Sequence, residues 1–118
     1  MDTKAHKGNH IRRHRKKCGL SQRELGRILG YANEAAVSRH EQSETIPPLL
    51  TAIAYEMVFH APIAQLFPGL QGAVEEAVNR RIGELESELQ KKLGKPRTAR
   101  LVAQKLAWID ERRAISEN

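Results

Sequence analysis

Glycines and prolines divide this chain into segments whose apolar residues follow the period of an α-helix. Gly19 and Gly30 close the first two segments, and Pro48 and Pro62 each open a later one. Within the segments the apolar residues recur every three or four positions, and no segment shows the alternation of a strand. Aromatic residues make up only 4% of the chain, a composition that suits packed helices better than a β-sandwich. The sequence therefore predicts an all-α protein.

The predicted helices form two groups. The first group has five short helices, at about 9–18, 21–29 and 34–41 and then two opened by the prolines. The second group is a long amphipathic helix from about 70 to 93 and a C-terminal helix at about 97–113, separated by Gly94-Lys95-Pro96. We expect a flexible arm at residues 1–8, a domain at 9–68 and a C-terminal helical extension at 69–118.

The composition limits the class of protein. A chain of 118 residues is enough for about one domain with a modest core. No apolar run approaches the ~20 residues of a membrane span and the N-terminus lacks a signal-peptide pattern, so we expect a cytoplasmic protein without membrane contact. The single cysteine, Cys18, excludes an internal disulfide and a cysteine-based zinc site, and we expect it to be a small core residue.

Positive charge is concentrated near the N-terminus. The chain carries 20 Lys+Arg against 14 Asp+Glu, and residues 1–30 hold nine of these basic residues against Asp2 and Glu24. Such an excess favours an anionic partner such as nucleic acid. The densest run, residues 12–17, is also compatible with a solvated helix face or a nuclear-localisation signal, so charge alone does not choose among them.

Residues 20–25 have the pattern of a helix start after a tight turn. Ser21 can cap the amide of Glu24, and the side chain of Glu24 can return to the amide of Ser21. The next helix has Asn33 as its expected N-cap and Val37 as its buried anchor. This order of helix, tight turn and helix is typical of DNA-binding helix-turn-helix proteins.

Several stretches, in matching order and spacing, carry a family resemblance. They are IRRHR at 11–15, GLSQREL at 19–25, VSRHE at 37–41, PP at 47–48 before a helix, and IAQLF at 63–67. Over residues 9–67 the chain resembles the Xre/phage-repressor (Cro/C1-type) helix-turn-helix family. The resemblance implies a five-helix repressor-like domain that binds double-stranded DNA and regulates transcription, in a protein of the bacterial or phage type.

The resemblance also implies particular DNA contacts. In the family the residue matching Gln22 is a phosphate clamp, and the recognition helix presents its exposed residues to base edges. An arginine can bind guanine with two hydrogen bonds, a glutamate can accept a hydrogen bond from cytosine N4, and an alanine can pack against the methyl group of thymine. For Arg39, a phosphate contact is an equally open alternative. The expected phosphate contacts are Ser21, Gln22, Arg23, Arg12, Lys16 and Lys17, and the expected base contacts are Asn33, Glu34, Ala35, Ala36, Ser38 and Arg39.

The family commonly pairs the residues matching Arg15 and Glu41 in a partly buried salt bridge between the first and third helices. The resemblance therefore implies a structural role for Arg15 rather than a DNA contact. Four features depart from the family pattern, and the first leaves the recognition-helix register open by one position. The turn at 30–33 is one residue longer, Gly26 replaces Ala, residues 42–44 replace the usual Asn-Gly, and His14 replaces an inward Leu.

A narrow apolar stripe on the long helix has two open interpretations. It could mediate a homodimer that binds two half-sites ~34 Å apart. It could instead pack on the last helix through Leu101, Leu106 and Ile109, and the two C-terminal helices could also hold a partner protein. The stripe consists of Val74, Val78, Ile82, Leu85 and Leu89.

The sequence predicts a dimeric, sequence-specific DNA-binding regulator, and repression is the commoner use of small members of the family. The alternatives are an antitoxin or anti-regulator whose C-terminal helices bind a partner protein, and a DNA-architectural or coactivator adaptor. We expect neither an enzyme nor a cofactor, because no phosphate-binding loop or nucleophile with a base is present. His6, His10 and His14 have helical spacing, but Gly8 interrupts it and nothing completes a metal site.

Overall fold

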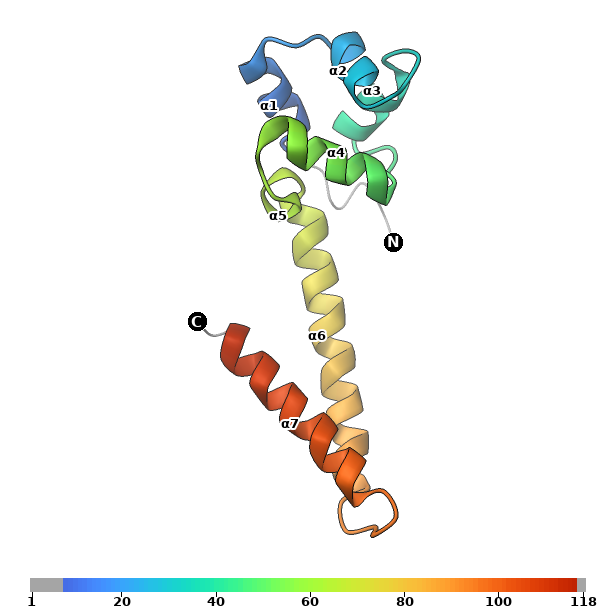
Figure 1. The fold of residues 1–118 in the computed structure, drawn as a ribbon, viewed down its shortest axis with the longest axis vertical. Helices are drawn as coiled ribbons and strands as arrows, with labels where there is room; N and C mark the ends of the chain where they lie inside the picture. The colour runs from blue at the N-terminus through green and yellow to red at the C-terminus, as the bar shows by residue number, and fades with distance from the viewer. Residues whose placement is uncertain (1–7, 117–118) are drawn as a thin grey trace. The chain divides into compact units, whose positions relative to one another are not determined.

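The computed structural model describes residues 8–116, and in this range the chain has seven α-helices and no strand (Figure 1). The predicted all-α class is confirmed. The predicted arm lies outside the described residues apart from Gly8. None of these helices is long and apolar enough to cross a membrane. The helices are α1 (Ile11–Cys18), α2 (Gln22–Ile28), α3 (Ala35–Glu41), α4 (Leu49–Phe59), α5 (Ile63–Leu66), α6 (Pro68–Lys91) and α7 (Ala99–Ser116).

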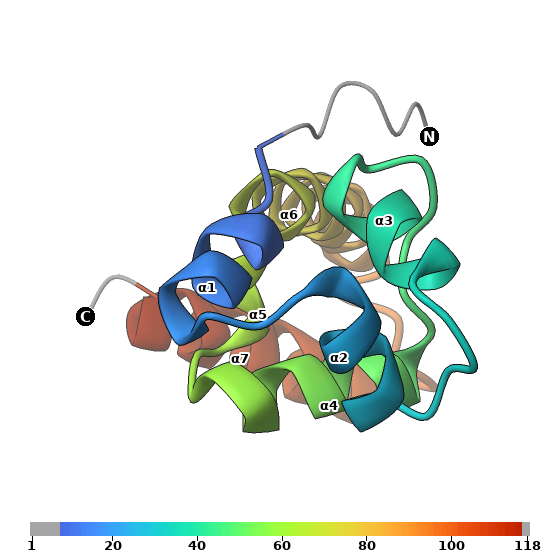
Figure 2. The same cartoon turned by 90° about the horizontal axis from the view of Figure 1, so that it is seen from above.

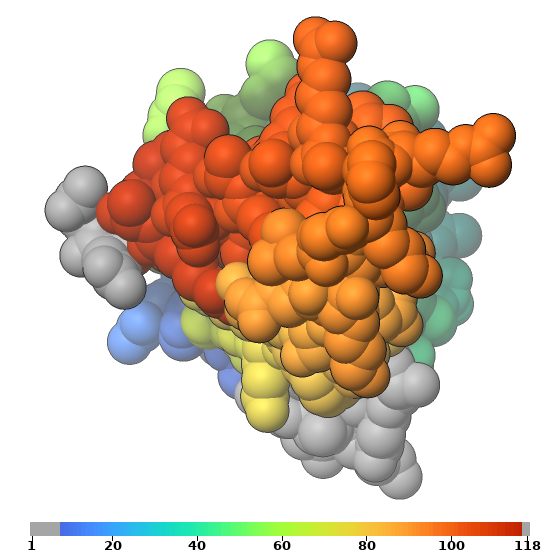
Figure 3. Space-filling view, turned by 90° about the horizontal axis from the view of Figure 1, so that it is seen from below, coloured from blue at the N-terminus to red at the C-terminus, as the bar shows by residue number. Residues whose placement is uncertain are grey.

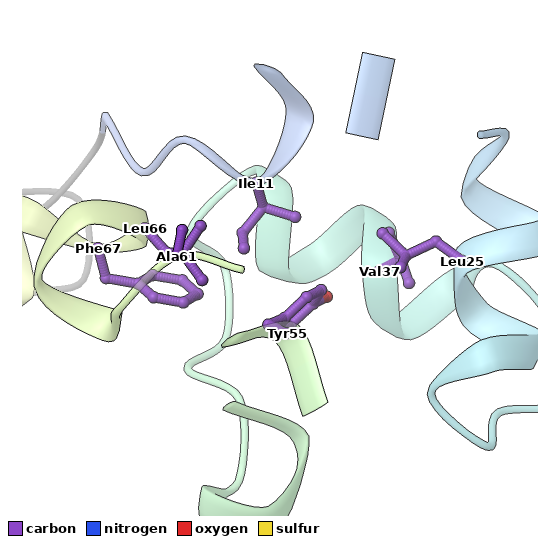
Figure 4. Packing of buried hydrophobic residues seen from close by; sticks show 7 residues of the cluster. All are labelled: Ile11, Leu25, Val37, Tyr55, Ala61, Leu66 and Phe67. Carbon is purple, nitrogen blue, oxygen red and sulfur yellow. The ribbon is translucent and has the colours of Figure 1, made fainter. Parts of the chain in front are cut away.

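The chain divides into two compact units, and the boundary falls inside α6. The N-terminal unit is Met1–Val74 and the C-terminal unit is Glu75–Asn118. In the N-terminal unit α3 contacts both α1 and α2, and α4 contacts α5 (Figure 2). The core of this unit is continuous through the fully buried Tyr55, which lies between its two parts (Figure 4). Leu25 and Val37 form one part, and Ile11, Ala61, Leu66 and Phe67 form the other.

The ends of the first two helices are determined by residues close to them in the sequence. The predicted capping box is present, with the Glu24 amide donating to Ser21 Oγ at 3.0 Å and the Ser21 amide donating to Glu24 Oε1 at 2.9 Å. Gly19 and Gly30 have left-handed φ angles of 76° and 95°. The Tyr31 amide then bonds the carbonyl of Gly26 at 2.8 Å, which closes α2 with a Schellman-type turn.

Three predicted helix boundaries are shifted. Asn9 was expected to begin the first helix and Asn33 to be the N-cap of the third, but each lies one residue before the observed N-cap, His10 or Glu34. The Oδ1 of each asparagine instead accepts from the amide two positions on, that of Ile11 at 3.2 Å or Ala35 at 2.9 Å. The long helix was expected to begin at about residue 70, yet Pro68 is the first residue of α6. A first-turn proline lacks only an amide hydrogen that has no helical partner there, so it opens the long helix without cost.

Several residues that the helical pattern predicts to be buried are exposed in the structure. Cys18 is exposed, because α1 ends there and the chain turns away at Gly19. Ile28 is 56% exposed at the last turn of α2. The helical spacing of Leu49, Ile53 and Met57 predicts that their side of α4 faces the core, and this prediction is wrong. Tyr55 faces the core, and the opposite side of the helix is left to solvent. This exposed face, with Ile46 before it, consists of Ile46, Leu49, Leu50, Ile53 and Met57.

The C-terminal unit is a pair of packed helices. Leu89 on α6 and Val102 and Ile109 on α7 are its buried residues, with Ile82 and Leu106 packed against them. This favours the intramolecular interpretation for two residues of the predicted stripe, while Val74 and Leu85 remain exposed. Arg113 also binds the carboxylate of Glu86 with two hydrogen bonds. Side chains of the segment that joins the two helices extend into solvent (Figure 3).

Gly26 is buried where α2 meets the turn before α3. A Cβ at this position would lie 2.6 Å from the carbonyl oxygen of Asn33, closer than real Cβ contacts come. The turn before α3 therefore requires a glycine at position 26, because it places a backbone carbonyl where an alanine methyl would stand.

We expect Gly26→Ala to destabilise the protein. The crowding should cost about 1–3 kcal/mol, which exceeds the helix-propensity gain of about 1 kcal/mol. Denaturant unfolding measures this, and Gly72→Ala is the matched control because a Cβ there meets nothing within 4 Å. The control should be neutral or stabilising, and a Gly26→Ala protein as stable as wild type would contradict the explanation.

Candidate nucleic-acid interface

An ion pair joins α1 to α3. Arg15 Nε donates to Glu41 Oε2 at 2.6 Å, and Arg15 Nη2 donates to Glu41 Oε1 at 3.2 Å. The two side chains are only 11% and 4% exposed. The third nitrogen group, Nη1, donates to the carbonyl of Leu20 at 2.9 Å, so the guanidinium also fixes the turn between α1 and α2. The pair expected from the family pattern is thus present.

The hydrogen bonds that Arg15 donates to Glu41 raise the pKa of Arg15 above its already high value, although burial opposes this. The guanidinium therefore remains charged at every pH at which the protein is folded. A charge in this position needs its carboxylate partner, since removing one member of a buried pair leaves the other uncompensated.

Gln22, the expected phosphate clamp, belongs to the same cluster. Its Nε2 donates to Glu41 Oε1 at 3.1 Å, so the first residue of α2 is tied to the last residue of α3. The side chain is half-buried, and one Nε2 hydrogen and the amide oxygen have no other partner among the described residues. Glu41 consequently positions Gln22 while leaving part of its amide available to a ligand.

The residues expected to read bases lie in the turn before α3 and along α3 itself. Glu34, Ala35 and Arg39 are exposed, whereas Ala36 and Ser38 are half-buried. Asn33 is exposed but its Oδ1 caps Ala35, which leaves its Nδ2 group as the outward donor. Of the predicted set, the exposed side chains with free hydrogen-bonding groups are therefore those of Asn33 (through Nδ2), Glu34 and Arg39.

The expected phosphate-binding residues differ in whether their side chains are already hydrogen-bonded within the protein. Arg12, Lys16, Lys17 and Arg23 are exposed on α1 and α2. Ser21 is exposed too, but its hydroxyl oxygen already accepts the amide of Glu24. The long basic side chains are thus the ones able to reach an anion from these helices.

Two internal contacts behind α3 were not anticipated. His40 Nδ1 and the Tyr55 hydroxyl lie 2.9 Å apart, buried between α3 and α4. Asn9 Nδ2 donates to the His40 carbonyl at 2.8 Å and to Ser43 Oγ at 3.1 Å. His40 follows the buried Val37 by three residues, so helical spacing alone could have placed it inside.

Ser43 lies in the loop that follows α3. It adopts a left-handed φ of 59°, a conformation that normally favours glycine, and its hydroxyl accepts the Asn9 bond. The side chain therefore supplies a contact that a glycine at this turn could not make.

Burial of His40 should make the protein less stable in mild acid. Burial, and secondarily the charge of Arg39, lower the pKa of His40 below its ordinary value of 6.5, so at mildly acidic pH the unfolded chain binds a proton that the folded chain does not. The contribution of neutral His40 to the free energy of unfolding should be complete above pH 6.5 and should decrease as the pH falls below 6.5. The loss should level off below the folded-state pKa.

His14 shares this behaviour, since burial also lowers its pKa and its ring packs 5.4 Å from that of Phe59. Thermal melts of His14→Phe at about pH 7.5 and 5.5 would isolate the effect of His40. Equal melting temperatures of this variant at both pH values would rule out the predicted destabilisation by buried His40.

The histidine face weighed in the sequence includes His6, which lies outside the described residues. Between residues 8 and 116, no three His, Cys, Asp or Glu side chains are grouped to hold a metal ion. His14 instead lies half-buried against α4, as expected for an inward-facing residue.

No protein-family model, curated protein or solved structure matches this chain. Its function is therefore inferred from its own residues.

Proposed function

We propose that the protein is a sequence-specific DNA-binding transcriptional regulator with a repressor-like helix-turn-helix, α2 and α3, inside the five-helix group α1–α5. The observation that carries this proposal is the cluster of Arg15, Gln22 and Glu41. It ties α1, α2 and α3 into one element through hydrogen bonds, which is the rigidity that a recognition helix needs.

The distribution of charge supports a division of labour. The exposed basic residues of α1 and α2 would attract phosphates without regard to sequence. Arg39 would enter the major groove with Glu34 and Ala35, since a guanidinium can bind guanine bidentately. Gln22 would add a phosphate contact with the part of its amide that Glu41 leaves free. Repression would follow from occupying a promoter as a dimer.

Footprinting against the DNA upstream of the protein's own gene tests the proposal. We expect one or two protected half-sites spaced by about one helical turn, and an affinity that falls steeply as salt increases. Binding that is equal on unrelated DNA and present only at low salt would contradict sequence-specific regulation.

A second candidate is a protein-binding module of the antitoxin or anti-regulator class. The exposed apolar face of α4 favours it, because soluble monomers rarely expose contiguous apolar patches of this kind without a partner. Co-expression with the product of an adjacent reading frame would test it. A stable complex that Met57→Glu abolishes, with Ala64→Glu on α5 as control, is the expected result.

A further inference from the structure

The turn between α6 and α7 carries a dense group of basic side chains. Five of the ten residues from 91 to 100 are Lys or Arg, and no acidic residue occurs between Glu88 and Asp110. All five are exposed, and no ion pair among the described residues includes any of them. We call this group the basic tip, and it consists of Lys91, Lys92, Lys95, Arg97 and Arg100.

The acidic residues of the C-terminal unit lie away from the basic tip. Residues 75–90 contain five acids and two arginines, and residues 106–116 contain two of each. In these stretches the charges can compensate one another, as Arg113 does when it binds Glu86 with two hydrogen bonds. The uncompensated positive charge of the unit is therefore gathered at the end of the hairpin where the chain turns.

Helix stability does not account for the whole of the basic tip. Lys91 and Lys92 lie at the C-terminal end of α6, where the helix dipole favours positive charge. Arg97 and Arg100 instead lie on either side of the first residue of α7, where the dipole disfavours positive charge, and the first turn of α7 has no acidic residue. The two arginines are unfavourable for the helix itself, and an anion from outside the chain would offset this effect.

The composition around the tip indicates which polyanion fits. Proteins that bind single strands stack bases on aromatic side chains, and residues 68–107 contain none. Surfaces that insert into membranes carry several large apolar side chains, whereas Leu93 is the only one in residues 91–100. Exposed lysines and arginines without such neighbours are suited to the phosphates of a duplex, which they attract without regard to sequence.

We propose that the basic tip binds the phosphate backbone of double-stranded DNA, as a contact separate from the helix-turn-helix and independent of base sequence. The identity of the partner rests on the proposed function, but the contact does not require that function to be sequence-specific. Each phosphate that the tip neutralises releases counterions, so the tip raises the affinity for any duplex and steepens its dependence on salt.

Replacing Arg97 and Arg100 together with glutamine tests the tip in the full chain. Gel-shift titration at several salt concentrations would use a duplex from upstream of the protein's own gene and a scrambled duplex of the same length. We expect the affinity for both to fall by the same factor, about 10–100-fold at ~0.1 M salt, and the slope of log K against log salt to become shallower by about 2. The melting temperature should be unchanged or slightly higher, because two unfavourable charges leave the start of α7.

Arg80→Gln with Arg81→Gln is the matched control. It removes two exposed arginines from the same unit, within one helical turn of Glu84. Because the acids beside these arginines leave little net positive charge there, the control should keep both affinities and the salt slope close to those of the wild type.

An unchanged salt slope in the tip variant, an equal change in the control, or a loss confined to the upstream duplex would overturn the proposal. Vesicles of phosphatidylcholine and phosphatidylserine test the other polyanion, and vesicle binding that the tip variant loses while it keeps DNA binding would also overturn it. A wild type that binds the two duplexes equally would refute sequence-specific regulation, whereas an equal loss on both duplexes in the tip variant would still support the tip.

Discussion

Replacing Glu41 with alanine should lower the free energy of unfolding of the N-terminal unit by about 3–5 kcal/mol. The carboxylate accepts both Arg15 hydrogen bonds and the Gln22 bond, and it is almost fully buried. Its loss leaves a guanidinium charged and unpaired at the junction of three helices. For a unit of this size the melting temperature should fall by more than about 10 °C.

Two variants separate the buried pair from general loss of charge. Glu41→Gln keeps an acceptor oxygen but removes the negative charge, so it should lie between wild type and Glu41→Ala. Glu84→Ala, at an exposed position on α6, should leave the melting temperature unchanged. If Glu41→Ala melted within a degree or two of wild type, the structural role of the pair would be refuted. The same holds if Arg15→Ala only weakened DNA binding without lowering the melting temperature.

Replacing Arg39 with alanine should weaken binding to the protein's own operator by about 10–100-fold, which corresponds to about 1–3 kcal/mol. Arg39 is exposed on α3 and pairs with no carboxylate among the described residues, so its loss should not unfold the domain. Gel-shift titration on the operator and on a scrambled duplex measures both affinity and discrimination. Arg80→Ala, on the exposed surface of α6, is the matched arginine control.

The scrambled duplex decides what kind of contact Arg39 makes. If it reads a base, Arg39→Ala should weaken binding to the operator far more than binding to the scrambled duplex. An equal loss on both would instead identify a phosphate contact, which is the alternative left open by the sequence. No loss on either duplex would remove Arg39 from the interface.

The sequence predicts well where helices occur, because the residues that start and end a helix are close together in the chain. The capping box at Ser21 and Glu24 and the left-handed glycines at 19 and 30 each involve only neighbouring residues. The ion pair of Arg15 with Glu41 was also expected, but only through the family pattern. Neither the helical period nor charge alone would have chosen Glu41 from the other acids.

Which face of a helix is buried was harder to predict, because it depends on distant partners. In α4 the apolar spacing of Leu49, Ile53 and Met57 suggests a core face, yet the helix turns Tyr55 inward. Tyr55 fills the centre of the core and its hydroxyl meets His40 from another helix, a combination that no local pattern reveals. The bond of Gln22 to Glu41 was missed for the same reason.

The contact between Gly26 and the Asn33 carbonyl makes two sequence changes interdependent. An alanine at 26 is expected to be harmful while the turn at 30–33 keeps its present length, and harmless or favourable once the turn is shortened by one residue. The effect of Gly26→Ala on stability would therefore change sign when the turn is shortened, which is epistasis with a steric origin. Comparing the two single variants with the double variant would measure this coupling directly.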